Sequence, residues 1–118
     1  MELNMADCIF CKIVNREIPA RIVYEDEKIL AFDDIRPQAP VHTLIIPKEH
    51  FSSLKEADES KAELLGYILL KAREIAALKG IEASGFRVVL NTGPDSGQEV
   101  FHVHFHLLGG RQLGWPPG

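Results

Sequence analysis

Three histidines alternate with apolar residues between positions 101 and 108, and no other feature of the chain constrains its fold as tightly. Alternation with a period of two is typical of a β-strand whose two faces differ. His102, His104 and His106 would project from one face, about 7 Å apart. The apolar residues would point from the other face into a core: Val103, Phe105 and Leu107. Histidine can act near neutral pH as nucleophile, acid, base or metal ligand, so this strand is the first candidate for a functional site.

The composition is ordinary for a globular protein, with 118 residues, 46% of them hydrophobic and 25% charged. This length predicts a single domain over residues 1–118. The net charge is −4 and the basic residues are scattered, which argues against nucleic acid as a partner. There is no apolar run as long as a membrane span and no signal-peptide pattern. We therefore expect no membrane partner and a cytoplasmic location.

Hydrophobic periodicity predicts five strands and two helices. We expect strands at 21–25, 29–33, 41–47, 86–91 and 101–108, a short helix at 7–15 and a long helix at 60–79. Asp7 is the expected N-cap of the short helix. Ser60 and Glu63 have the spacing of a capping box at the start of the long helix, and Gly80 follows that helix where a C-cap glycine is favoured. This order of elements predicts an α+β fold with an antiparallel sheet.

The long helix is apolar over a wider arc than one sheet can cover. Its core stripe is extended on one flank by further apolar residues, which we expect to pack on another subunit. The stripe comprises Leu64, Leu65, Ile68, Leu69, Ala72, Ile75 and Ala76, and the extension comprises Tyr67, Leu70, Ala77 and Leu78.

A polar, glycine-containing loop at 92–99 leads into the histidine strand. Gly93 and Gly97 allow backbone N–H groups to approach an anion closely. Ser96, Gln98 and Asn91 would add side-chain donors. Such loops are common in hairpins, but beside three imidazoles a phosphate site is the better interpretation.

Cys8 and Cys11 have the spacing of half a structural zinc site. The alternative is that both thiols are small apolar fillers on the buried side of the first helix.

The segment from Gln98 to Arg111 resembles the histidine-triad signature, and residues 109–118 are similar to the end of the histidine-triad nucleotide-binding (Hint) branch. The resemblance to bacterial members of this family also covers residues 9–10, 31–35, 37–40, 42 and 46–50. It implies the HIT-like fold, with about five antiparallel strands, one long and one short helix, and a two-fold homodimer whose sheets are continuous. The terminal segment 115–118 would lie near the partner's active site.

The resemblance also implies a purine nucleoside phosphoramidase that hydrolyses the P–N bond of adenosine 5′-phosphoramidates. His104 corresponds to the nucleophile, which would form a nucleotidyl-histidine that water then cleaves. His106 would contact the phosphate oxygens, and His42 and His102 would support protonation at the site. No cofactor would be required for the reaction.

By the same resemblance, Asp34 would hold the ribose hydroxyls of a purine nucleotide. The base slot would be lined by Ile9, Phe10, Ile13, Phe32, Ile35 and Leu44; for Ile13 and Phe32 a plain core position is an equal alternative. The phosphate and ribose side would be lined by Asn91, Gly97, Gln98, Glu99 and Val100. Glu99 departs from the small hydroxyl residue of eukaryotic members, and Gly114 replaces a frequent histidine. We assign no catalytic role to Glu99, because a carboxylate near a phosphate is repelled.

Some bacterial relatives complete the cysteine pair with two histidines, which here correspond to His50 and His102. The resemblance therefore implies a closed, structural Zn²⁺ site formed by Cys8, Cys11, His50 and His102.

Three other functions are compatible with the residues. One is a nucleotide-binding regulatory protein whose hydrolysis is incidental. Another is a zinc hydrolase in which His102 and His104 share a catalytic metal. The third is a dinucleoside polyphosphate hydrolase or nucleotidyl transferase, which would use the same strand.

Overall fold

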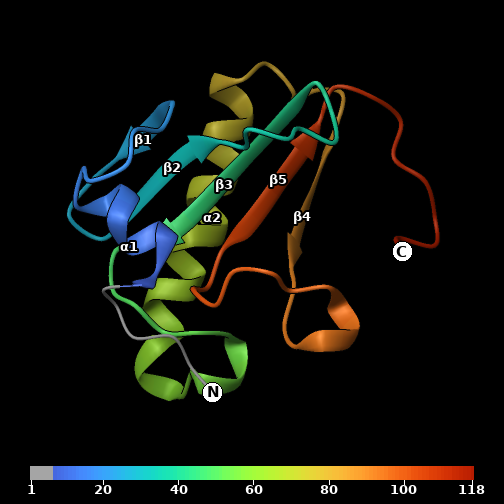
Figure 1. Ribbon diagram of the computed structural model, residues 1–118. Helices are drawn as coiled ribbons and strands as arrows, with labels where there is room; N and C mark the ends of the chain where they lie inside the picture. Colours follow the sequence, from blue (N-terminus) through green and yellow to red (C-terminus); the bar gives the residue numbers. More distant parts are fainter. Residues whose placement is uncertain (1–6) are drawn as a thin grey trace.

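Five antiparallel strands form a single sheet in the computed structural model, which describes residues 7–118 (Figure 1). The order across the sheet is β1-β2-β3-β5-β4. The helices and strands are α1 (Ile9–Val14), β1 (Ile22–Glu25), β2 (Ile29–Asp33), β3 (Val41–Pro47), α2 (Ala62–Leu78), β4 (Phe86–Leu90) and β5 (Phe105–Gly109). Three short 3₁₀ helices lie in the connections, at Leu54–Glu56, Glu59–Lys61 and Pro94–Ser96. The predicted α+β class with an antiparallel sheet is confirmed.

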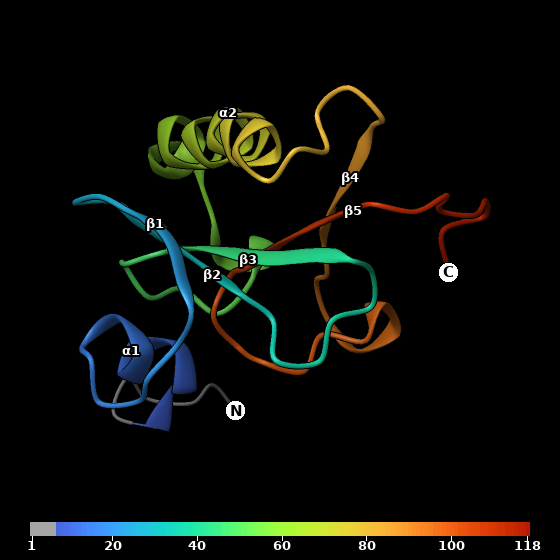
Figure 2. The same ribbon diagram turned by 90° about the horizontal axis from the view of Figure 1, so that it is seen from above.

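The two helices lie on opposite faces of the sheet (Figure 2). Strand β2 shows why both faces are covered, since Ile29 and Ala31 belong to the core cluster that contains the buried side of α2. Leu30 and Phe32 alternate with them and belong to the cluster that contains α1. A strand buried on both faces reads as a continuous apolar run rather than as an alternation with polar residues.

The caps of both helices differ in part from the prediction. The N-cap of α1 is Cys8 rather than Asp7, and its Sγ accepts a hydrogen bond from the Cys11 N–H at 3.4 Å. The capping box at Ser60 and Glu63 is also wrong. Ser60 lies inside the preceding 3₁₀ helix, where its N–H donates to the Asp58 carboxylate at 2.9 Å, so the α-helix begins only after that turn is complete.

The C-terminal cap of α2 agrees with the prediction. Gly80 has φ +77° and its N–H donates to the carbonyl of Ala77, while the N–H of Ile81 donates to the carbonyl of Ala76. This pair of bonds is a Schellman motif, and glycine adopts its left-handed position without steric cost.

The histidine segment forms a regular strand only from Phe105 onward, so the predicted strand at 101–108 is wrong in its first half. The ladder to β3 starts at the pair Ile45 and Phe105. Two pairs further along this register Val103 would face Pro47, which has no N–H to donate. Upstream of Phe105 the chain instead bonds elsewhere, with the Val103 N–H donating to the Phe51 carbonyl at 2.9 Å.

The flank of α2 that faces away from the sheet remains apolar and open to solvent. Leu70 is 65% exposed and Leu78 68%. Leu69 was predicted in the core stripe, but it lies on this open flank and is 51% exposed. Within residues 7–118, no helix combines the length and apolar character needed to cross a membrane.

Candidate active site

His104 is almost fully buried in the extended segment before β5, and one of its ring nitrogens has a fixed role. Its Nδ1 lies 2.7 Å from the carbonyl oxygen of His102. A carbonyl can only accept, so Nδ1 carries the ring proton and Nε2 keeps its lone pair. Burial lowers the pKa of His104 below its usual value. At neutral pH the ring is therefore a neutral imidazole with a free nucleophilic nitrogen.

His42 and His106 form a chain of hydrogen bonds whose direction is set by the backbone. The N–H of Gln38 donates to Nδ1 of His42 at 3.0 Å, so the His42 proton is on Nε2. That nitrogen lies 2.9 Å from Nδ1 of His106 and donates to it. In a neutral His106 the proton is then on Nε2, which is left as a hydrogen-bond donor.

The rings of His42, His104 and His106 make one contiguous group. The His106 ring centroid lies 5.0 Å from that of His104 and 5.1 Å from that of His42. Burial lowers the pKa of His106 to about 4, with smaller contributions from the two neighbouring histidines, and burial also lowers the pKa of His42. The group therefore presents a lone pair on His104 beside an N–H donor on His106, both uncharged at neutral pH.

Asp34 lies at the end of β2, beside this histidine group. Its Oδ1 accepts from the Arg36 N–H at 2.8 Å, and its Oδ2 is 3.5 Å from Nε2 of His42. The Asx-type turn fixes the carboxylate at the edge of a 380 Å³ hollow. That hollow is lined by Arg21, Asp33, Asp34, Ile35 and Pro37. An acceptor in this position suits a ligand that carries hydroxyl groups.

The apolar residues expected in the base slot divide into two groups. Four of them are buried in the cluster between α1 and the sheet: Phe10, Ile13, Phe32 and Leu44. The Phe10 ring packs edge-on against Phe32 at 5.5 Å and against His104 at 5.1 Å. Ile9 and Ile35 are exposed instead, Ile35 to 92%. Exposed apolar side chains beside the buried cluster leave a surface that an apolar ring could cover.

The glycine loop is held together by Gln98. Its Oε1 accepts from the Gly93 N–H at 2.9 Å, and its Nε2 donates to the carbonyls of Ser52 at 2.8 Å and Val100 at 3.1 Å. Gly93 and Gly97 have φ of +81° and +83°, as glycine permits. Because both amide protons of Gln98 are used, its side chain stabilises the loop instead of offering donors to a ligand.

The other loop residues lie as follows. Ser96 Oγ donates back to the Gly93 carbonyl at 2.7 Å, so its hydroxyl proton is also used inside the loop. Asn91 is half-buried, Glu99 is exposed, and Val100 packs against the cluster that contains Phe10.

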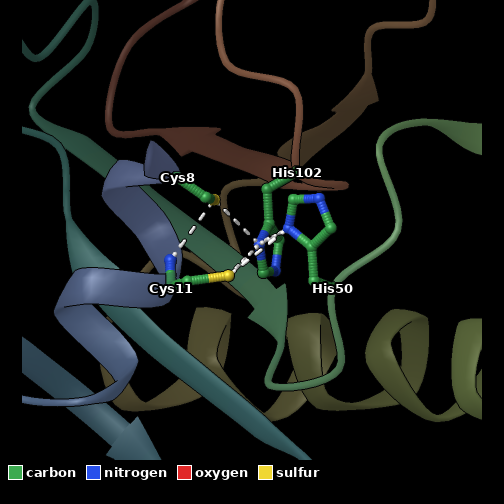
Figure 3. A group of neighbouring side chains, drawn as sticks. All are labelled: Cys8, Cys11, His50 and His102. Atoms are coloured by element: carbon green, nitrogen blue, oxygen red, sulfur yellow. Dashed lines mark hydrogen bonds between the residues drawn. The ribbon is translucent and has the colours of Figure 1, made fainter. Parts of the chain in front are cut away.

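Cys8, Cys11, His50 and His102 converge into a second group (Figure 3). The Nδ1 atoms of His50 and His102 are 3.1 Å apart. Cys11 Sγ is 3.3 Å from Nδ1 of His50 and 3.6 Å from Nδ1 of His102, and Cys8 Sγ is 3.4 Å from Nδ1 of His102. Tetrahedral zinc with ordinary bond lengths would place such ligand atoms roughly 3.3–3.8 Å apart. The three sulfur–nitrogen distances lie in this range and the distance between the two Nδ1 atoms is slightly shorter, so the Cys₂His₂ set fits zinc.

The protonation of His102 supports this fit. Its Nε2 donates to the carbonyl of Pro47 at 2.8 Å, which leaves the Nδ1 lone pair directed at the two thiols. Burial lowers the pKa of His102 to about 4. Neutral imidazole is the form that binds metal.

The arrangement does not favour a catalytic metal shared by His102 and His104. The lone pair of His102 points to the cysteines, and Nδ1 of His104 carries a proton. Asp34, His42 and His106 form a third group, whose possible ligand atoms lie within 4.8 Å of one another. This group does not favour a metal either, because His42 would have to lose its only ring proton to bind one through Nε2.

The main-chain groups that set these protonation states were not predicted from the sequence. The N–H of Gln38 and the carbonyls of Pro47 and His102 each bond a histidine ring. Pro47 was recognisable as the end of a strand, but nothing in its residue type indicated an acceptor for His102.

Comparison with known proteins gives consistent matches. The family model described as HIT domain matches residues 15–113. The chain is 53% identical over 118 residues to the 14 kDa zinc-binding protein of Zea mays, covering 98% of this chain and 91% of that protein. It is 50% identical over 112 residues to adenylylsulfatase HINT1 of Arabidopsis thaliana, covering 93% and 76%. A crystal structure of a HIT family hydrolase from Legionella pneumophila superposes with a TM-score of 0.93 at 53% identity, covering 95% of this chain and 100% of that one.

Proposed function

The chain belongs to the HIT domain family, and on that premise we propose that it hydrolyses the P–N bond of adenosine 5′-phosphoramidates. The family and the named relatives indicate a nucleotide-binding hydrolase. The observation that carries the finer proposal is the pairing of a free Nε2 on His104 with an N–H donor on His106. A nucleophile and a donor side by side suit displacement at a phosphorus atom.

In the proposed reaction, Nε2 of His104 attacks the α-phosphorus and the P–N bond to the amine breaks. The departing nitrogen takes its proton from Nε2 of His106. For this step the hydrogen-bonded pair of His106 and His42 would carry one extra proton, which the anionic substrate favours, because a neutral imidazole that gave up its only N–H would be left as an imidazolate. The nucleotidyl-histidine carries positive charge on its ring, and the His102 carbonyl stabilises that charge through Nδ1–H. Water then attacks the phosphorus, returns a proton to the histidine group and releases AMP.

The nucleotide would be held by the surrounding residues. Asp34 would accept hydrogen bonds from the ribose hydroxyls, and the base would lie over Phe10, Leu44 and the exposed side chains of Ile9 and Ile35. The backbone of Gly97 to Val100, with Asn91, would face the phosphate and ribose. The purine preference follows from the family resemblance alone.

Cys8, Cys11, His50 and His102 would hold a structural Zn²⁺, which supplies a cross-link between α1 and the histidine segment. The relative from Zea mays that is named a zinc-binding protein supports this assignment. The His104 reaction above requires no metal.

A homodimer is part of the proposal. The open apolar flank of α2 and the 83% exposed Trp115 are surfaces that a second copy would cover. Strand β4 ends the sheet, so its outer edge is open to pair with a partner strand.

A second substrate class is favoured by one comparison. The relative from Arabidopsis thaliana is named an adenylylsulfatase, and adenosine 5′-phosphosulfate presents the same α-phosphorus with sulfate as the leaving group. A regulatory nucleotide-binding protein and a dinucleoside polyphosphate hydrolase are the further alternatives.

The decisive experiment is mass spectrometry of protein quenched during turnover. We expect an added AMP that maps to His104 with adenosine 5′-phosphoramidate as substrate. Parallel rates with adenosine 5′-phosphosulfate and diadenosine polyphosphate rank the substrate classes. Turnover without any adduct, and with wild-type rate in His104→Ala, would refute the covalent mechanism. Binding without turnover of any of the three would favour the regulatory protein.

A further inference from the structure

The metal cluster and the proposed nucleotide site share one turn of α1. Phe10 lies between Cys8 and Cys11 in the sequence, and all three side chains are buried. The Phe10 ring meets the His104 ring edge-on at 5.1 Å and the His102 ring at 6.0 Å. The residue between the two thiols therefore contacts both a cluster ligand and the proposed nucleophile.

The histidine segment provides a second connection between the two sites. His102 directs its ring at the cluster and its carbonyl at the Nδ1–H of His104. The neighbouring residue Val103 donates its N–H to the carbonyl of Phe51, which follows His50 directly. The hydrogen bond between Val103 and Phe51 therefore joins the residues that directly follow the two cluster histidines, and it holds the segment that carries His104.

The helix that carries the thiols depends on the cluster for its own end. It has only six residues, a length that is unstable in isolation. Its N-cap is the sulfur of Cys8, which accepts from the Cys11 N–H and also faces His102, as Figure 3 shows. A metal that fixes this sulfur fixes the first turn of α1 and, with it, Phe10.

We propose that zinc in the cluster and a nucleoside monophosphate at His104 bind cooperatively, with Phe10 and His102 as the coupling residues. The inference rests on the proposed function, because it assumes a nucleotide beside His104. Bound zinc orders α1 and the histidine segment before the nucleotide arrives, so nucleotide binding then costs less conformational entropy. Coupling between sites is reciprocal, so bound nucleotide raises the affinity for zinc by the same factor.

The experiment measures, on the full chain, the effect of zinc on AMP affinity and the effect of AMP on zinc affinity. AMP affinity is determined by calorimetry for zinc-loaded and chelator-stripped protein, and zinc affinity by chelator competition with and without saturating AMP. We expect both affinities to rise by the same factor, about 5-fold or more. Circular dichroism establishes whether the stripped protein remains folded.

A variant of Phe10 tests the route. Phe10→Leu keeps all four ligands but removes the aromatic contact with His104. It should reduce the factor clearly below the wild-type value, and the part that remains is the contribution of the His102 connection. Val14→Ala, a truncation at the far end of the same helix, is the matched control and should retain the wild-type factor. If stripping unfolds the whole protein, the factor will be equally large in Phe10→Leu, and that result overturns the local route.

The outcomes separate this inference from the proposed function. If AMP binds with the same affinity with and without zinc, or if the protein binds no zinc, the coupling is refuted while the nucleotide site stands. If AMP fails to bind the zinc-loaded protein at any usable concentration, the proposed function fails and the coupling fails with it.

Discussion

The carbonyl oxygen of His102 accepts a hydrogen bond from Nδ1 of His104 at 2.7 Å, and this one contact decides which nitrogen of His104 can react. The same residue turns its ring toward two cysteines and a histidine. The main chain of a metal-cluster residue therefore holds the side chain of the proposed nucleophile.

Replacing the nucleophile separates chemistry from binding. In His104→Ala we expect turnover of adenosine 5′-phosphoramidate to fall at least about a thousandfold, because no other lone pair lies at that position. AMP affinity should change far less, since Asp34 and the apolar wall remain. Steady-state kinetics and calorimetry measure the two quantities. A variant that retains half of the wild-type rate would remove His104 from the nucleophile's role.

The stability of the protein should depend on pH through His106. Its pKa is lowered by burial to about 4 in the folded state, whereas a free imidazole titrates near 6.5. The unfolded chain therefore takes up the proton first as the pH falls. The contribution of His106 to stability is complete above about pH 6.5 and is lost progressively down to about pH 4.

Urea unfolding of the wild type and of His106→Asn, measured from pH 7.5 to pH 4, tests this. Asparagine is of similar size and does not titrate, so the variant should lose less free energy of unfolding over the range. Superimposable pH profiles for the two proteins would show that His106 is not protonated differently on folding.

Gln98 should contribute more to stability than its place in a surface loop suggests. Gln98→Met leaves the Gly93 N–H and the Ser52 and Val100 carbonyls without their partner, which should cost about 1–3 kcal/mol. The KM for the phosphoramidate should rise as the loop loosens. Asp95→Asn, an exposed change in the same loop, is the control for the thermal-denaturation measurement. An unchanged melting temperature in Gln98→Met would contradict the argument.

The open flank of α2 should mediate self-association. A carboxylate buried in an apolar interface is unfavourable, so Leu70→Glu should shift sedimentation toward monomer without lowering the melting temperature of the monomer. Leu54→Glu makes the same change at a residue outside α2 that is 44% exposed. If the wild type itself sediments as a monomer at micromolar concentration, the dimer proposal is wrong.

Most of the sheet could be predicted from local pattern. The strands at 29–33 and 41–47 have the predicted bounds, because their apolar runs end at Asp33 and at Pro47. The long helix ends at Leu78, within one residue of the predicted end, because Gly80 is suited to the left-handed conformation that follows it. Its start was misplaced because Ser60 is a good capping residue by type but lies in a 3₁₀ turn that Asp58 caps, and α2 follows that turn without a side-chain cap of its own.

The site was predictable in its side chains but not in their protonation. The motif identified the histidines, and the cysteine spacing pointed to half of the cluster. Which ring nitrogen of His42 carries the proton depends on a backbone N–H at Gln38, four residues away across a turn. The role of Gln98 was misassigned for a similar reason, since its partner Ser52 is 46 residues distant.

The bond from the Gln38 N–H to His42 has a consequence for how this site can vary and be copied. Any residue except proline supplies this main-chain N–H, so position 38 could vary over evolution while the tautomers of His42 and His106 stay the same. A search for conserved side chains would overlook it. Conversely, transplanting the histidines alone onto another protein's sheet would transfer the rings without the donors and acceptors that orient them, and the graft would not reproduce the chemistry.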